Sequence, residues 1–175
     1  KFVLNLIDTP GHSDFSYEVS RALHAVEGAI LLVDATQGIQ AQTLANLRAA
    51  EAAGLTIIGA LNKVDLNPPG MDDLTLELAE LIHAEPDEIH RVSGKTGQCV
   101  EQLLQAVVEK IPPPSIRVNP RNNPRESAMP ARALVFDSFY DNHKGIVASV
   151  RVMNGIFLGG KETIFVATER KWKPK

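Results

Sequence analysis

Five consecutive residues near the start of the chain have types that suit phosphate chemistry. They read Asp8-Thr9-Pro10-Gly11-His12 and follow the apolar run at 3–7 directly. A carboxylate at a strand end can hold Mg²⁺ through its water shell, and a glycine three residues later lets a backbone N–H approach a terminal phosphate. Asp8 is therefore a candidate metal-binding residue and Gly11 a candidate phosphate-binding residue. The same residues also fit an ordinary connection between a strand and a turn.

A second motif, Asn62-Lys63-Val64-Asp65, has the residue types of a guanine-binding loop. The carboxylate of Asp65 can accept two hydrogen bonds from the N1–H and the exocyclic amine of guanine, a donor pair that adenine lacks. The amide of Asn62 can tie neighbouring loops together, and the stem of Lys63 can lie on the face of the base. A polar loop without a ligand explains the motif about as well when it is taken alone.

A third motif, Ser93-Gly94-Lys95, is weak evidence by itself. In a guanine site, the backbone N–H of its middle residue, Gly94, would read the base oxygen O6. What favours a guanine-nucleotide site is that all three motifs occur in the required order, each just after an expected strand, at the rim where an α/β sheet binds its ligands.

The elements that would position these motifs form an open α/β sheet. Short apolar runs at 3–7, 29–33 and 55–61 predict strands that are buried on both faces of a parallel sheet, and a short segment at 89–92 precedes the third motif. Apolar residues at helical spacing predict amphipathic helices at 15–26, around 44–47, at 74–82 and at 100–111. Strands that alternate with helices require right-handed crossovers, which place the strand ends and their polar residues on one edge.

Composition divides the chain at a proline-rich segment. Six prolines fall between 112 and 130, a density that excludes helix and sheet and predicts an interdomain linker: Pro112, Pro113, Pro114, Pro120, Pro124 and Pro130. Beyond it, runs at 131–137, 146–152 and 162–167 predict antiparallel strands, and Asn154-Gly155 predicts a tight hairpin turn. We therefore expect one domain at 1–111, a linker at 112–130 and, at 131–175, the start of an antiparallel β-barrel domain with too few strands to close.

The order of the motifs resembles a G domain, the guanine-nucleotide switch fold, from its third sheet strand onward. A histidine after Asp-Thr-Pro-Gly is typical of translational GTPases, and several further stretches closely resemble the LepA-type elongation factor, a ribosomal back-translocase family: 15–23, 41–46, 111–114 and 133–142. Elongation factor G and the BipA type share the first motif but differ in the helix after it. One departure lies in the guanine loop, because Gly94 stands where the family usually has alanine.

The resemblance implies a ribosome-dependent GTPase that binds GTP or GDP with Mg²⁺ and hydrolyses GTP during protein synthesis. It implies that Asp8 holds the metal, that Gly11 binds the γ-phosphate and that His12 orients the attacking water. The guanine pocket would consist of Asn62, Lys63, Asp65, Ser93, Gly94 and Lys95. The implied partner is the ribosome rather than DNA, in the cytoplasm, with peripheral association of the parent protein at the inner face of the membrane.

One part of a complete GTP site does not occur in the sequence. No G-x-x-x-x-G-K-[ST] loop is present, although that loop and its lysine cradle the β- and γ-phosphates in such enzymes. Since the chain begins with Lys1 in an expected strand, we expect an internal fragment of a longer protein that is inactive on its own. Two alternatives stay open: another translational GTPase of the elongation factor G or BipA type, and a non-catalytic nucleotide-binding or interaction module.

Charge and composition exclude several other classes. The 175 residues include 18 Lys and Arg against 21 Asp and Glu, for a formal net charge of −3. The chain is therefore not a strongly basic protein that binds nucleic acid through its overall charge. The single cysteine, Cys99, excludes an internal disulfide framework. The longest apolar stretch, near 29–33, falls far short of the roughly 18 residues of a membrane-spanning helix.

Overall fold

The computed structural model describes residues 2–9, 16–114, 131–157 and 159–174, which form two compact units, Lys1–Pro114 and Ser115–Lys175. In the first unit, β1 (Gly28–Asp34), β2 (Thr56–Asn62) and β3 (His90–Arg91) form a parallel sheet in the order β1-β2-β3. The helices of this unit are α1 (Ser16–Leu23), α2 (Ala41–Ala52), α3 (Met71–Leu81) and α4 (Val100–Lys110), with short 3₁₀ turns η2 (Val64–Leu66) and η3 (Pro86–Glu88).

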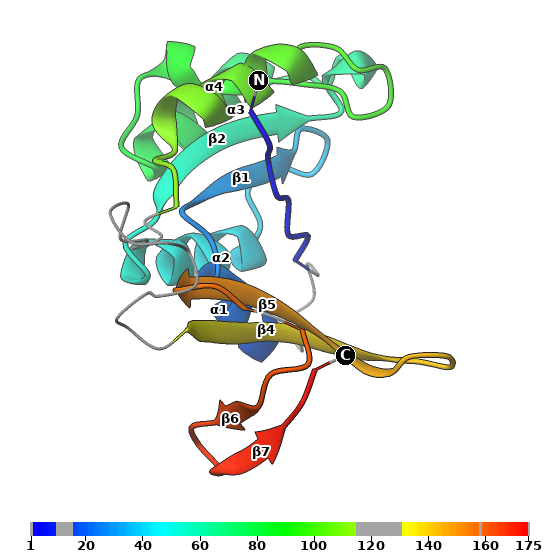
Figure 1. The fold of residues 1–175 in the computed structure, drawn as a ribbon. Coiled ribbons are helices and arrows are strands. Elements are labelled where there is room, and N and C mark those ends of the chain that lie inside the picture. Colours follow the sequence, from blue (N-terminus) through cyan, green and yellow to red (C-terminus); the bar gives the residue numbers. More distant parts are fainter. Residues whose placement is uncertain (1, 10–15, 115–130, 158, 175) are drawn as a thin grey trace. The chain divides into compact units, whose positions relative to one another are not determined.

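Side chains of β2 alternate between two apolar cores, one on each face of the sheet. On one face, Leu61 packs in a cluster with Leu31 and Val33 of β1, Leu47 of α2 and Leu78 of α3. On the other face, Ile58 and Ala60 pack against Leu103 and Ala106 of α4. Figure 1 shows helices on both sides of the β1–β2 pair. The prediction of a parallel sheet with both faces covered is confirmed for these strands.

The carboxyl ends of β1 and β2 lie side by side because the two strands are paired in register over their full length. Gly28 of β1 is the partner of Thr56, and Asp34 is the partner of Asn62. The ladder continues one residue past the end of β1, where the N–H of Ala35 donates to the carbonyl of Asn62 at 2.9 Å. Any side chain that follows β1 is therefore a close neighbour of the Asn62 loop.

The predicted strand at 3–7 is wrong for the described structure. Residues 2–9 have no regular secondary structure, and the side chains of Phe2, Val3 and Leu6 are 75%, 82% and 87% exposed. An apolar run becomes a strand only when a neighbour supplies ladder hydrogen bonds, and among the described residues no strand pairs with this segment. The apolar pattern alone could not show that.

The second unit contains two separate two-stranded antiparallel sheets. Strands β4 (Arg132–Asp141) and β5 (Gly145–Asn154) form one, and β6 (Thr163–Phe165) and β7 (Arg170–Trp172) form the other. The rings of Phe165 and Trp172 contact each other across β6 and β7, with their centroids 6.1 Å apart. Within the described part of this unit the strands close no barrel.

Among the described residues no hairpin turn lies at Asn154-Gly155, where the sequence predicted one. Asn154 is still paired, with Arg132, and the chain turns between β4 and β5 at Asp141–Gly145 instead. The carboxylate of Asp141 accepts the N–H groups of His143 and Lys144, both at 2.8 Å, and Gly145 has a φ of +78°. A carboxylate that closes its own turn and a glycine with positive φ make this turn as effectively as Asn-Gly would.

Candidate guanine-nucleotide site

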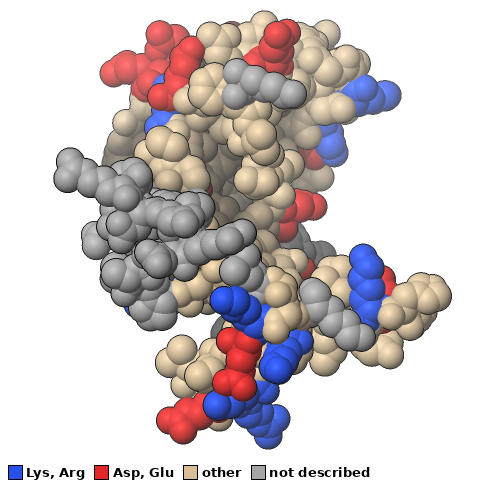
Figure 2. Space-filling model, in the orientation of Figure 1, with Lys and Arg blue, Asp and Glu red and all other residues tan. Residues whose placement is uncertain are grey.

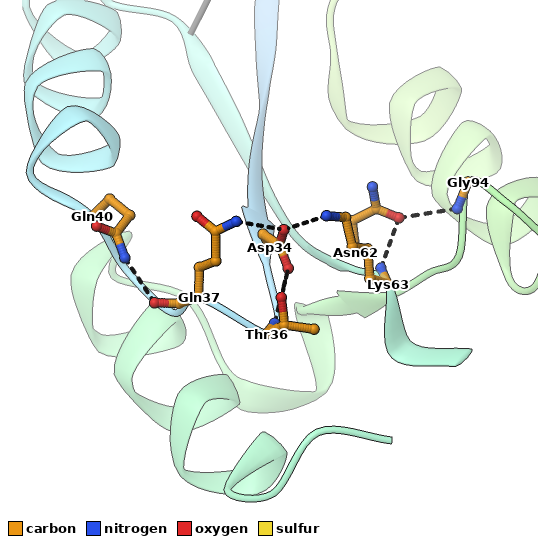
Figure 3. Close-up of polar contacts among 7 residues, drawn as sticks. All are labelled: Asp34, Thr36, Gln37, Gln40, Asn62, Lys63 and Gly94. Atoms are coloured by element: carbon orange, nitrogen blue, oxygen red, sulfur yellow. Dashed lines mark hydrogen bonds and ion pairs between the residues drawn. The ribbon is translucent and has the colours of Figure 1, made fainter. Parts of the chain in front are cut away.

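Asn62 joins two of the three predicted motifs through a single side-chain oxygen. It is the last residue of β2, and its Oδ1 accepts the N–H of Lys63 at 2.8 Å and the N–H of Gly94 at 3.0 Å (Figure 3). The loop after β2 and the loop after β3 are therefore held together at the carboxyl edge of the sheet. This is the tying role that the sequence suggested for the amide.

Lys63 occupies a strained backbone conformation between these loops. Its φ is +67°, in the left-handed region that costs a residue with a β-carbon roughly 1–2 kcal/mol. Its N–H is bound by Asn62 Oδ1, and its Nζ lies 2.6 Å from Oδ2 of Asp34, the last residue of β1. The next residue, Val64, donates its N–H to the carbonyl of Val92 at 3.3 Å. Hydrogen bonds on either side of the α-carbon and an ion pair at the side-chain end therefore hold this residue in place.

Asp65 lies in the short turn η2 with its residue half-buried. Within the described part of the chain its carboxylate makes no hydrogen bond and no ion pair with another residue. Both oxygens are therefore available as acceptors beside the Asn62 junction. A bidentate acceptor without an intramolecular partner is what two adjacent donors on a guanine edge require.

Ser93 shapes the third motif from inside. Its side chain is fully buried, its Oγ accepts the N–H of Thr96 at 3.1 Å, and its carbonyl accepts the N–H of Gly97 at 2.9 Å. Its own N–H donates to the carbonyl of Gln98 at 3.1 Å. The loop closes around this serine and leaves Gly94 and Lys95 exposed.

The expected donor to the base oxygen is already engaged. The N–H of Gly94, which the sequence analysis assigned to guanine O6, donates to Asn62 Oδ1 in this structure. The adjacent N–H of Lys95 has no hydrogen-bond partner among the described residues. The difference arises because the bonding of a loop N–H depends on the neighbouring loop, which the tripeptide alone cannot show.

The phosphate-side candidates are less well defined. Asp8 is exposed in the irregular segment 2–9, and among the described residues it makes no hydrogen bond or ion pair. Gly11 and His12 lie outside the described residues. The structure therefore brings Asn62, Lys63 and Gly94 together, with Asp65, Ser93 and Lys95 on the same loops, and it does not bring Asp8 to them.

Asp34 is a polar residue at this edge that the sequence reading missed. Its Oδ1 accepts the N–H and Oγ1–H of Thr36 at 2.9 and 2.7 Å, and its Oδ2 accepts from Nε2 of Gln37 at 3.3 Å and pairs with Lys63 (Figure 3). The hydrogen bond from the Lys63 ammonium, followed by that from the Thr36 hydroxyl, lowers the pKa of Asp34 to about 2. Its signal in the sequence was its position: an acidic residue directly at the end of a buried parallel strand.

Replacing Asn62 tests the junction between the loops. Asn62→Ala removes the acceptor of two backbone N–H groups, and we expect the free energy of unfolding to fall by about 1–2 kcal/mol in urea titrations, with faster amide exchange at Gly94. Asn62→Asp keeps an acceptor oxygen and is the matched control.

A second control addresses loop shape. A β-carbon at Gly94 would lie 3.7 Å from Asn62 Oδ1, an ordinary contact, so Gly94→Ala should change stability by less than about 0.5 kcal/mol.

Equal stability of Asn62→Ala and Asn62→Asp would contradict the role of the Oδ1 junction.

The lowered pKa of Asp34 predicts a specific acid response. Because the folded pKa is depressed, the stabilisation is fully present above the unfolded pKa of about 3.9 and is lost as the pH falls through about 2. Following the Asp34 carboxyl carbon by NMR should show a midpoint near pH 2, and Lys63→Met should move that midpoint upward. A midpoint near 3.9 in the unsubstituted chain would refute the ion pair.

Comparison with known proteins places this chain in a family. The sequence pattern of the family described as the Elongation factor Tu GTP binding domain matches residues 1–113. A protein of Corynebacterium efficiens named Elongation factor 4 is 56% identical over 155 residues, which cover 89% of this chain and 24% of that protein. One of Thermobifida fusca with the same name is 55% identical over 154 residues, 88% of this chain and 24% of that protein. The chain thus spans about a quarter of the length of these curated relatives.

Solved structures of more distant proteins share the fold. The crystal structure of a bacterial selenocysteine-specific elongation factor, EF-Sec, matches with a TM-score of 0.68 at 24% identity, over 95% of this chain and 28% of that chain. The elongation factor SelB of Methanococcus maripaludis, solved with the GTP analogue GppNHp, matches with a TM-score of 0.67 at 19% identity, over 95% of this chain and 36% of that chain.

The identity to the curated relatives confirms the resemblance to LepA-type elongation factors, of which Elongation factor 4 is the name in use. With the family pattern over residues 1–113 and the Asn62 junction at the edge of a parallel sheet, the chain belongs to the family of the elongation factor Tu GTP-binding domain.

Proposed function

We propose that this chain carries the base-reading part of the GTP site of a ribosome-dependent GTPase of the LepA elongation factor type. The observation that carries the proposal is the Asn62 junction, which holds the Asn-Lys-x-Asp loop against the Ser93–Lys95 loop. Beside it lies the carboxylate of Asp65, which has no polar partner among the residues that the structure describes. The full-length protein is the protein at the length of its curated relatives.

Guanine would be read by groups that the fold leaves available. The Asp65 carboxylate would accept from N1–H and the exocyclic amine, and the stem of Lys63 would cover one face of the base. Because Asn62 engages the N–H of Gly94, we assign the hydrogen bond to O6 to the N–H of Lys95. Ser93 would contribute indirectly, because its buried hydroxyl accepts the N–H of Thr96 and fixes the loop that presents the Lys95 N–H.

The phosphate side of the proposal rests on the first motif. Asp8, an exposed carboxylate, has the hard oxygen ligands that Mg²⁺ prefers and would hold the ion through water, and the N–H of Gly11 would bind the γ-phosphate. His12 would orient the water that attacks that phosphate. The metal supplies charge that stabilises the transferring phosphoryl group. Because the sequence lacks the G-x-x-x-x-G-K-[ST] loop, the 175-residue chain by itself would bind GTP weakly and not hydrolyse it.

The proposed partner is the ribosome, in the cytoplasm, with no role for DNA. Figure 2 shows basic and acidic side chains together on the visible face of each unit, and the formal net charge of the chain is −3. Across the described residues no helix is both long and apolar enough to span a membrane. Peripheral association with the membrane stays a prediction of the family resemblance.

Base choice gives the direct test of the guanine pocket. In the full-length protein, Asp65→Asn replaces an acceptor by a donor, so we expect GTP affinity to fall at least tenfold and xanthosine triphosphate to bind better than in the unsubstituted protein. Calorimetry or fluorescent-nucleotide displacement measures both. Asp73→Asn, an exposed change of equal charge on α3, is the matched control. Unchanged GTP affinity with no gain for the xanthine nucleotide would remove Asp65 from the pocket.

The role of His12 separates hydrolysis from binding. In the full-length protein, His12→Ala should leave GTP affinity within a few-fold, because the imidazole would act on water rather than on the nucleotide. Ribosome-stimulated phosphate release should fall by roughly 10²–10⁴, the usual contribution of a group that positions or transfers a proton. Hydrolysis close to that of the unsubstituted protein would exclude the catalytic assignment, and a parallel loss of binding would show that the loop had collapsed.

A further inference from the structure

The carboxylate of Asp34 connects the loop after β1 to the proposed guanine loop, although it belongs to none of the three motifs. Oδ1 receives two hydrogen bonds from Thr36, and Oδ2 receives Lys63 Nζ at 2.6 Å and Gln37 Nε2 at 3.3 Å. Figure 3 shows these residues as one chain of contacts that continues through Asn62 to Gly94. A side chain with this many donors has a fixed orientation.

Asp34 is held in place independently of Lys63. The N–H groups of Gln37 and Gly38 donate to the Asp34 carbonyl at 3.0 and 2.9 Å, which closes the turn after β1. A further hydrogen bond connects this turn to the start of α2: Nε2 of Gln40 donates to the carbonyl of Gln37 at 2.7 Å. The carboxylate is therefore a fixed point to which the longer side chain of Lys63 can be held.

Lys63 gains most from such a fixed point. Its side chain is 49% exposed, and a lysine stem that is free in solvent samples many rotamers, so ordering it costs conformational entropy. The Asn62 and Val92 contacts fix its backbone but not its stem. Only the ion pair with Asp34 restrains the far end of the side chain among the described residues.

We propose that Asp34 is a positioning residue for the nucleotide base: by holding Lys63 Nζ, it orders the Lys63 stem as a preformed wall of the base pocket. The inference rests on the proposed function, since it assigns that stem to the base. The inference adds a residue outside the guanine motifs. Asp34, at the end of the neighbouring strand β1, contributes to guanine affinity without touching the nucleotide.

The competing explanation is that Asp34 only closes its own turn. Asp34→Asn distinguishes the two, because the asparagine oxygen can still accept both bonds from Thr36 while the anionic partner of Lys63 is lost. Lys63→Met is the complementary change, because it keeps an apolar stem and removes the ammonium. If Asp34 acts through Lys63, the two changes remove the same interaction, and their effects are not additive.

The experiment measures GDP affinity of the full-length protein by calorimetry for both single variants and the double variant, with Asp73→Asn as the charge control. We expect each single variant to bind GDP about fivefold more weakly, the upper end for a half-exposed ion pair, and the double variant to lose no more than either single one. The loss from Asp34→Asn should shrink in 1 M salt, which screens the pair. Thermal unfolding of Asp34→Asn, recorded alongside, shows whether the turn is kept.

The possible results distinguish a failure of the Asp34 role from a failure of the proposed guanine-nucleotide site. Wild-type GDP affinity in Asp34→Asn, or losses that add in the double variant, would overturn the positioning role while Asp65→Asn still shifts base choice. Unchanged GDP affinity in a stable Asp34→Asn variant would assign Asp34 to its turn alone, and additive losses would show that Asp34 acts on the nucleotide by a route other than Lys63. If the unsubstituted full-length protein binds GDP no better than ADP, the proposed function fails, and the inference fails with it.

Discussion

The structure of the candidate site depends on one oxygen atom, Oδ1 of Asn62. Two N–H groups, one from the following residue and one from Gly94 more than thirty residues later, converge on it. Without this acceptor the loops after β2 and β3 would be joined here mainly by backbone contacts such as Val64 to Val92. An asparagine at this position is more than a polar strand end, because a single carbonyl oxygen with two lone pairs can serve two donors at once.

The parallel sheet brings the loops after β1, β2 and β3 to the same edge. In parallel strands that pair in register, the residues that follow the carboxyl ends emerge at one edge, so Asp34, Asn62 and the residues after β3 become neighbours without any long connection. Burial of β2 between two apolar cores keeps the edge fixed in position. The left-handed backbone of Lys63 shows the cost of this arrangement, since strain of that kind persists only where surrounding contacts determine the conformation.

Sequence patterns predicted the part of the fold that rests on local signals. The β-branched runs of β1 and β2 and the helical spacing of α3 and α4 gave the correct elements, because burial on both faces leaves a continuous apolar run and amphipathic helices leave a periodic one. The motif Asn62–Asp65 was placed correctly at a strand end for the same reason. Asp34 was missed because one acidic residue at the end of a strand has no distinctive spacing, and its partner Lys63 lies in the loop after a different strand.

The remaining differences between expectation and structure arise where the outcome depends on a partner elsewhere in the chain. The run at 3–7 has the composition of a strand but lacks a ladder among the described residues, and Asn154-Gly155 has the composition of a hairpin turn but lies where Asn154 still pairs with Arg132. The N–H of Gly94 has the freedom to read a base but is taken by Asn62. In each case the local chemistry was read correctly, and a long-range hydrogen bond, present or absent, decided the structure.

The two halves of the proposed GTP site therefore differ in how they are built. The base-reading residues lie on loops that a packed sheet and the Asn62 junction hold in place without any nucleotide. Asp8 lies on an exposed segment that no described strand or side chain fixes. Base recognition can then be preformed, so that little ordering entropy opposes it, whereas the proposed metal binding by Asp8 would draw on a segment outside the sheet. A site of this design would use the base to secure the nucleotide and the phosphates to change the conformation around them.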